Sequence, residues 1–180
     1  MLFSYDDCVK KYGSDYQIKK AIREGHLYKV QAGLYSDRRF PSVEEIAGYL
    51  YPNAIVTMDS ALYYYDLTDV IPDQLYLATT RGSRQIKNPK IRQIFENSRN
   101  FTMGKVTATK DGVSIKIYNR ERMLVELLRH KNSLPFDYYK EVLGNYRDIV
   151  YDLDIPLIQE YAAALPKKQM VLNALQMEVF

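Results

Sequence analysis

The segment from Tyr12 to Tyr35, YGSDYQIKKAIREGHLYKVQAGLY, restricts the fold of this chain more than any other stretch. Ser14 followed three residues later by Gln17 has the form of a capping box, which marks the start of a helix. Apolar residues then recur at helical spacing, and Gly25 is placed to end the helix as the residue after its C-cap. The apolar stripe that we expect to be buried consists of Ile18, Ala21 and Ile22.

The residues on either side predict two further parts. Ser4 and Asp7 form another capping box, so a first helix precedes the second, and Gly13 reverses the chain between them. After Gly25, residues 27–30 and 34–36 have the composition of two short strands joined by a turn. Two short helices followed by a β ribbon are typical of a winged helix-turn-helix. We therefore predict that residues 1–40 form such a DNA-binding domain.

The outward face of the second helix is basic and polar, as a helix that enters the major groove requires. An ordinary solvated surface has the same composition, and only the order of the elements favours DNA. We expect base contacts from Tyr16, Gln17 and Lys20, phosphate contacts from Lys19 and Arg23 in the same helix, and phosphate contacts from Lys29, Arg38 and Arg39 in and beside the ribbon.

Charge is unevenly distributed along the 180 residues, although the net charge is only +3. Residues 41–80 contain six acidic and no basic side chains, whereas residues 81–110 contain eight basic and one acidic. The basic block is either a second nucleic-acid surface, a patch for an acidic partner, or a partner of the acidic block before it. The basic residues of interest in it are Arg81, Arg84, Lys87, Lys90, Arg92, Arg99 and Lys105.

Residues 41–180 predict a mixed α/β domain that ends in a set of helices. A helix is expected from Ser42, a strand at residues 74–80, and a hairpin around Asp111-Gly112, which is a strong turn signal. Asn119 then caps a helix, and three more helices follow at about 135–143, 156–165 and 167–177. The fold class that we predict is α+β.

Features of a catalytic or membrane protein are missing from the sequence. There is no phosphate-binding P-loop and no G-x-G-x-x-G, and the only Cys, Cys8, is expected to be a buried small hydrophobe. Asp152 and Asp154 could hold a divalent metal, but Asp before a helix is more often a cap. We expect no catalytic residues, no metal and no cofactor. Without a signal peptide or a long apolar run, a cytoplasmic protein is expected.

Three short motifs occur in a characteristic order. Gly33-Leu34-Tyr35 ends the ribbon, Ser60-Ala61-Leu62 lies in a central helix, and Arg120–Leu128 forms a later helix. In this order the chain resembles the AbiEi-type antitoxins of type IV toxin–antitoxin, or abortive-infection, systems over nearly its whole length. It departs from them at Gln31-Ala32, where Arg often precedes the wing glycine, and at Glu126, where Asp is usual. We expect the second departure to alter only an indirect interaction.

The resemblance implies an antitoxin that is also a transcriptional autorepressor in phage defence. Its winged helix would bind inverted repeats in the double-stranded DNA of its own promoter. Its C-terminal domain would counteract a cognate nucleotidyltransferase-like toxin without a stable complex. Two alternatives remain: a stand-alone winged-helix regulator whose C-terminal domain senses a ligand or oligomerises, and a metal-dependent nucleic-acid enzyme that uses Asp152 and Asp154.

Overall fold

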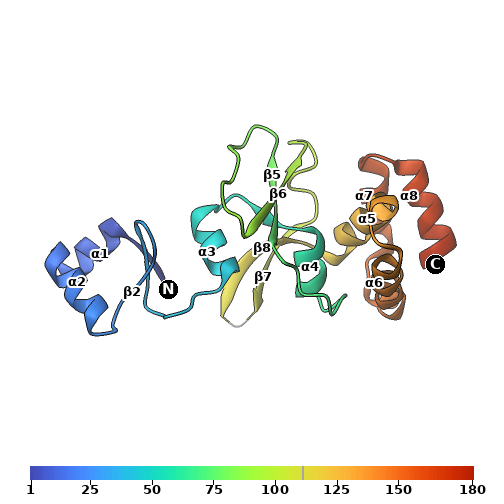
Figure 1. Cartoon of the computed structure of the whole chain (residues 1–180). Helices are drawn as coiled ribbons and strands as arrows, with labels where there is room; N and C mark the ends of the chain where they lie inside the picture. Colours follow the sequence, from blue (N-terminus) through green and yellow to red (C-terminus); the bar gives the residue numbers. More distant parts are fainter. Residues whose placement is uncertain (111) are drawn as a thin grey trace. The chain divides into compact units, whose positions relative to one another are not determined.

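The chain folds into two compact units, Met1–Pro52 and Asn53–Phe180, in a computed structural model that describes residues 1–110 and 112–180 (Figure 1). Helices and two sheets are mixed, so the predicted α+β class is confirmed. The sequence places the domain boundary between residues 40 and 41, whereas the first compact unit extends to Pro52. Among the described residues, every helix is too short or too polar to span a lipid bilayer.

The first unit combines three helices with a small antiparallel sheet. Its strands lie in the order β1-β3-β2, and Leu34 of β3 pairs with both Ser4 and Gln31. Strand β1 was not predicted, because three residues before a capping box carry no strand periodicity of their own. The elements are β1 (Leu2–Ser4), α1 (Tyr5–Tyr12), α2 (Asp15–Arg23), β2 (Tyr28–Gln31), β3 (Leu34–Ser36) and α3 (Val43–Leu50).

The core of the first unit lies where helices α1 and α2 meet the sheet. Ile18 of α2 and Cys8 of α1 are each 1% exposed, and Leu27 is fully buried. Tyr35 of β3 completes the cluster. Cys8 is therefore the buried hydrophobe that the sequence predicts. Burying a side chain of the size of Ile18 or Leu27 stabilises the fold by about 1.5–3 kcal/mol.

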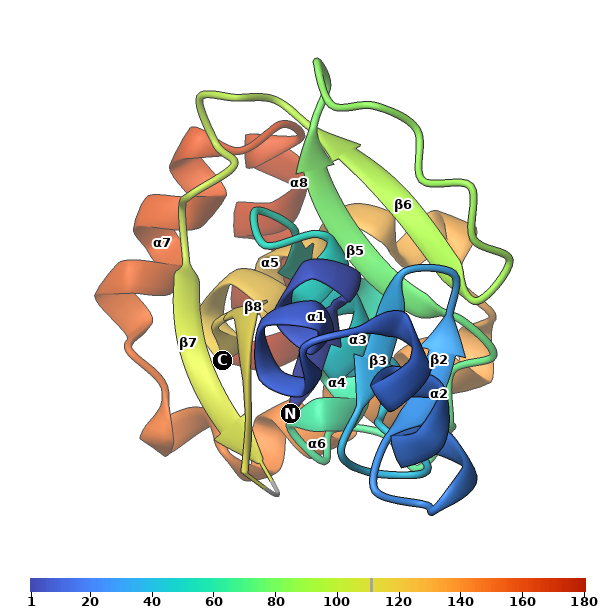
Figure 2. The same ribbon diagram turned by 90° about the vertical axis from the view of Figure 1, so that its left-hand side faces the viewer.

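The second unit contains a mixed five-stranded sheet with the order β6-β5-β4-β8-β7. Strands β5 and β6 are parallel, as are β4 and β8, while the β4–β5 and β7–β8 pairs are antiparallel. Figure 2 shows β5 and β6 side by side and the long connection that returns along β6. The strands are β4 (Ile55–Val56), β5 (Leu75–Thr80), β6 (Ile91–Glu96), β7 (Lys105–Lys110) and β8 (Val113–Tyr118).

The predicted hairpin is present as β7 and β8, and Gly112 has the positive φ of 76° that its turn position requires. Its predicted partner in the turn, Asp111, lies outside the described residues. Strand β6 was not predicted. Its sequence, IRQIFE, does not alternate between apolar and polar residues. It pairs in parallel with β5, as Leu75 with Ile91, across a connection that contains no helix.

Among the described residues of the second unit, five α-helices pack together, and α5 is central among them. From Arg122 to Leu128 every residue of α5 is buried, which is typical of a helix surrounded on all sides. Helices α7 and α8 pack against it (Figure 1). The helices are α4 (Met58–Tyr64), α5 (Arg120–His130), α6 (Phe136–Asp148), α7 (Ile155–Ala164) and α8 (Lys168–Ala174), which continues as a π-helical turn, Leu175–Val179.

Candidate nucleic-acid interface

Helix α2 has well-defined ends. At its start the amide of Gln17 donates a hydrogen bond to Ser14 Oγ over 3.4 Å, as the predicted cap requires. At its end Gly25 has a φ of 75°. The amide of Gly25 donates to the carbonyl of Ile22 (3.2 Å), and the amide of His26 donates to the carbonyl of Ala21 (2.9 Å). This pattern is a Schellman motif, which favours Gly at the left-handed position. The helix therefore begins and ends where the sequence predicts.

The two faces of α2 differ sharply. Ile18 and Ala21 are 1% and 5% exposed and pack into the core, and Ile22 is half-buried against it. Tyr16, by contrast, is 66% exposed although it is a large aromatic residue. The structure places all five candidates of this helix on its exposed side: Tyr16, Gln17, Lys19, Lys20 and Arg23.

Two of these cations pair with carboxylates of the same helix region. Lys19 Nζ lies 2.7 Å from Asp15 Oδ2, and Lys20 Nζ lies 3.8 Å from Glu24 Oε1. The hydrogen bond to Asp15 raises the pKa of Lys19. Exposed pairs of this kind contribute little to stability, so either lysine can exchange its partner for a phosphate. Arg23 forms no ion pair with any described residue.

The three candidates outside α2 have different environments. Lys29 is exposed on β2, and the guanidinium of Arg39 lies 5.4 Å from the ring centre of Phe40. Arg38 Nη2 instead contacts Glu45 Oε2 over 2.6 Å, and the Glu45 side chain is only 13% exposed. Arg38 therefore fastens α3 to the segment after β3, and its guanidinium is already engaged. The role predicted for Arg38 at a phosphate competes with this contact.

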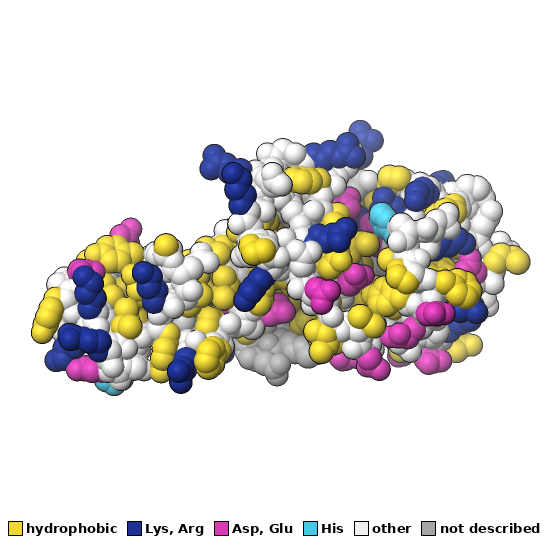
Figure 3. All heavy atoms as spheres, in the orientation of Figure 1, with side chains coloured by type: hydrophobic (Ala, Val, Ile, Leu, Met, Phe, Trp, Pro, Cys, Tyr) yellow, Lys and Arg dark blue, Asp and Glu magenta, His cyan; other side chains and the backbone are white. Residues whose placement is uncertain are grey.

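Most basic candidates of the second unit lie in the β5–β6 connection or on β6, while Arg99 follows β6 and Lys105 begins β7 at the other edge of the sheet. Arg81, Arg84, Lys87 and Lys90 all lie in the connection between β5 and β6. Figure 3 shows dark blue side chains projecting from this part of the unit. All seven basic candidates of the second unit are exposed, and none forms an ion pair with another described residue: Arg81, Arg84, Lys87, Lys90, Arg92, Arg99 and Lys105. Pairing with the acidic block, one of the three alternatives, is not seen for them.

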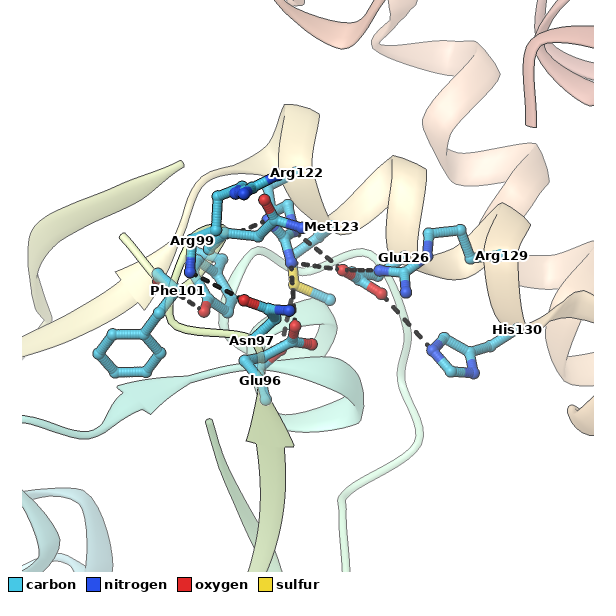
Figure 4. A network of polar contacts seen from close by, with 12 residues as sticks. Glu96, Asn97, Arg99, Phe101, Arg122, Met123, Glu126, Arg129 and His130 are labelled. Atoms are coloured by element: carbon cyan, nitrogen blue, oxygen red, sulfur yellow. Dashed lines mark hydrogen bonds and ion pairs between the residues drawn. The ribbon is translucent and has the colours of Figure 1, made fainter. Parts of the chain in front are cut away.

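A buried ionic network lies beneath this region (Figure 4). Arg122 is fully buried; its Nε donates to Glu126 Oε1 over 2.9 Å, and its Nη1 donates to the carbonyl of Asn100 over 3.2 Å. Arg129 Nη1 donates to the same Glu126 oxygen over 2.6 Å, and His130 Nε2 lies 3.5 Å from Glu126 Oε2. Glu126 is thus a central contact within the unit. The sequence signals for the network are the i,i+3 and i,i+4 spacings that join Glu126 to Arg122, Arg129 and His130, and such spacings occur equally on exposed helices.

The network holds two carboxylates in different electrostatic environments. Burial acts to raise the pKa of Glu126, but the hydrogen bond to His130 and the charges of Arg122 and Arg129 outweigh it and leave that pKa below its usual value. At Glu96, burial and the nearby charge of Glu126 raise the pKa, although Arg122 Nη2 lies 3.7 Å away. Glu126 is therefore the ionised centre of the network, while Glu96 binds a proton more readily than an ordinary Glu.

The structure positions the β6–β7 connection, residues 97–104, against this network. Besides the contact from Arg122 to Asn100, the Tyr118 hydroxyl donates to the carbonyl of Phe101 over 2.8 Å. The amide of Asn119 donates to the carbonyl of Gly104 over 2.7 Å. The segment that carries Arg99 is consequently held in place by buried groups of β8 and α5.

Asp154, one of the two carboxylates considered for a metal, acts as a helix cap. Its Oδ1 accepts the amide of Leu157 over 3.0 Å, at the start of α7. Across residues 1–110 and 112–180, no group of three or more His, Cys, Asp or Glu side chains is arranged to hold a metal ion. No family model matches this chain, and no curated protein matches it.

Proposed function

We propose that the chain is a DNA-binding antitoxin and autorepressor of a type IV toxin–antitoxin system. The first unit acts as a winged helix-turn-helix: α2 enters the major groove at inverted repeats in the promoter, and the β2–β3 hairpin lies beside it. The second unit counteracts a nucleotidyltransferase-like toxin without forming a stable complex with it.

The observation that carries the DNA-binding proposal is the exposed polar face of α2. A capped helix of nine residues presents a tyrosine, a glutamine and three cations to solvent while its other face packs on α1 and the sheet. Gln17 and Lys20 can hydrogen-bond to base edges, and Lys19 and Arg23 can neutralise phosphates. The antitoxin part is supported by the order of the three motifs that resemble the AbiEi-type proteins.

A gel-shift titration with the DNA upstream of the gene tests the first part. In the Lys20→Ala/Arg23→Ala double variant we expect weaker binding and a smaller salt dependence. Each lost phosphate contact lowers the slope of log K against log salt by about 0.9 in magnitude. The control is Lys140→Ala/Lys168→Ala, which removes the same charge from exposed positions of the second unit. An unchanged affinity and slope in the α2 variant would remove this helix from the interface.

Gln17→Ala tests sequence readout within the same experiment. Loss of a base contact costs about 1–3 kcal/mol at the affected base pair and relaxes the preference there. Arg23→Ala, a change at a phosphate candidate, should instead weaken binding to all duplexes alike. If Gln17→Ala weakens binding to operator DNA and to unrelated DNA equally, Gln17 does not contact the bases.

Co-expression with the product of the neighbouring gene tests the antitoxin part. The full chain should restore growth, and the Lys20→Ala/Arg23→Ala variant, expressed from an unrelated promoter, should restore it equally well. That result would separate neutralisation from repression. Lack of rescue by a folded wild-type chain would favour the stand-alone regulator instead.

A further inference from the structure

We propose that the second unit binds single-stranded nucleic acid on the face of β6 that carries Phe95 and the basic connection, defined as residues 81–90. The ligand chemistry is a phosphodiester backbone with unstacked bases, in either RNA or DNA. This site is separate from the α2 face and does not depend on the function proposed for it.

The basic connection is an ordered segment. The Gln93 side chain of β6 makes two of its contacts. Its Oε1 accepts a hydrogen bond from the amide of Ile86 over 2.8 Å, and its Nε2 donates one to the carbonyl of Arg84 over 3.2 Å. The same Nε2 donates to Thr79 Oγ1 over 2.7 Å. At the far end Gln74 Nε2 donates to the carbonyl of Pro89 over 2.7 Å. The side-chain amide of Gln93 thus holds the middle of the connection against β6. The cations of the basic connection are therefore presented on a fixed backbone.

Among the described residues, these cations have no carboxylate partner. Arg81, Arg84 and Lys87 are exposed and make no ion pair with any described residue. The only acidic residue in the whole 81–110 block, Glu96, is instead oriented toward Arg122. A cluster of unpaired cations without a compensating anion produces a local positive field, which a polyanion can occupy.

An exposed aromatic ring lies beside this field. Side chains alternate along a strand, so Phe95 points to the same face of β6 as Gln93. Phe95 pairs in register with Thr79, which Gln93 also contacts. Its side chain is 45% exposed. A ring next to ordered cations is the combination on which successive bases of a single strand stack.

The geometry favours a single strand over a duplex. A loop held flat along an edge strand offers neither a helix nor a ribbon that could enter a major groove. The ring of Phe95 would meet only the outside of paired, stacked bases, whereas an unpaired base can lie on it. Stacking also tolerates any base, so we expect little sequence preference.

Fluorescence anisotropy with labelled oligouridylate and oligothymidylate of about 16 nucleotides, the upper end of what comparable sites cover, tests the proposal on the full chain. Phe95→Leu should weaken binding about 5- to 100-fold, and Phe95→Tyr should restore it because the stacking ring is kept. Arg81→Ala/Arg84→Ala/Lys87→Ala should lower the salt slope by about 2, at ~0.7 for each phosphate contact. The two oligonucleotides distinguish an RNA site from a DNA site.

Matched controls make each outcome decisive. Phe136→Leu changes another exposed Phe of the same unit, which is 66% exposed, and should leave binding unchanged. All titrations are repeated in the Lys20→Ala/Arg23→Ala background, so that any binding by the first unit is identified. Binding that survives there and is lost with Phe95→Leu supports the proposal. No binding of either oligonucleotide, binding unaffected by Phe95→Leu, or stronger binding of a duplex of the same length would overturn it. A failed operator gel shift would leave this result untouched.

Discussion

Gly104 shows how one missing side chain determines a close contact. Its φ is 75°, and a Cβ there would lie 2.7 Å from Arg122 Cβ and 2.8 Å from Asn119 Oδ1. Gly112 has nearly the same φ, 76°, but a Cβ there meets nothing within 4 Å. The two positions therefore share the backbone cost of a left-handed residue, about 1–2 kcal/mol, and differ in the steric clash.

We predict that Gly104→Ala destabilises the second unit clearly more than Gly112→Ala, because the first substitution must also displace the buried Arg122. Urea unfolding followed by circular dichroism measures the difference in the free energy of unfolding. Equal losses in the two variants would show that the segment around Gly104 relaxes freely.

The environment of Glu126 predicts that the stability of the second unit falls at acid pH. The pKa of Glu126 is lower in the folded chain than in the unfolded chain, so the unfolded chain binds more protons at acid pH. The stability that Glu126 contributes is therefore present above the usual Glu pKa of about 4.3. It is lost as the pH falls through the lowered pKa of the folded chain. The pKa of Glu96 is raised instead, so the stability that Glu96 contributes decreases as the pH rises above the usual Glu pKa. Just above that pH, this decrease partly offsets the stability that Glu126 gains.

The change that tests this is Glu126→Gln. At pH 7 we expect a loss of about 3–5 kcal/mol, since the buried Arg122 loses its nearest counter-charge. Between pH 5 and pH 3, roughly one unit either side of the usual Glu pKa, the variant should lose less stability than the wild type, because the titrating group is gone. Glu160→Gln, at an exposed site, is the control. Parallel stability–pH curves for wild type and Glu126→Gln would contradict the assignment.

Among helices and strands, local sequence signals predict the structure where they are strong. The capping residues Ser4, Ser14, Ser42 and Asn119 all accept the expected backbone amide. The elements that were missed, β1 and β6, derive their pairing from partners that sequence periodicity does not reveal. Helix α4 begins at Met58, and Thr57 precedes it without a side-chain cap bond. Long-range pairing overrides local preference at such positions.

The cap of α2 can be tested separately. Ser14→Ala removes the acceptor for the amide of Gln17, and the expected loss is about 1 kcal/mol of stability in the first unit. Ser14→Asp should retain the cap and place a negative charge at the helix N-terminus, which the helix dipole favours. Thermal melting by circular dichroism compares the three chains. If Ser14→Asp melts as low as Ser14→Ala, the cap contributes nothing at this site.

Across the whole chain, the sequence predicts which α2 candidates are exposed but not which contacts the other candidates make. Residue type and helical spacing were sufficient to place Tyr16, Gln17 and Arg23 on one exposed face. The engagement of Arg38 by Glu45 could not be predicted, since it joins residues on either side of the predicted domain boundary. The Arg122 network depends in the same way on burial, which composition alone does not give for charged residues.

The division at Pro52 predicts unequal independence of the two units. Met1–Pro52 is below the size at which a single hydrophobic core is ordinarily sufficient, and a 60-residue domain already buries only about 60% of its unfolded surface. Asn53–Phe180 has a five-stranded sheet and the fully enclosed helix α5. Expressed separately, the second fragment should melt in one cooperative transition, whereas the first should show a broad transition at lower temperature. Far-ultraviolet circular dichroism of both fragments decides this. A second fragment without a cooperative transition would mean that its core requires residues before Asn53.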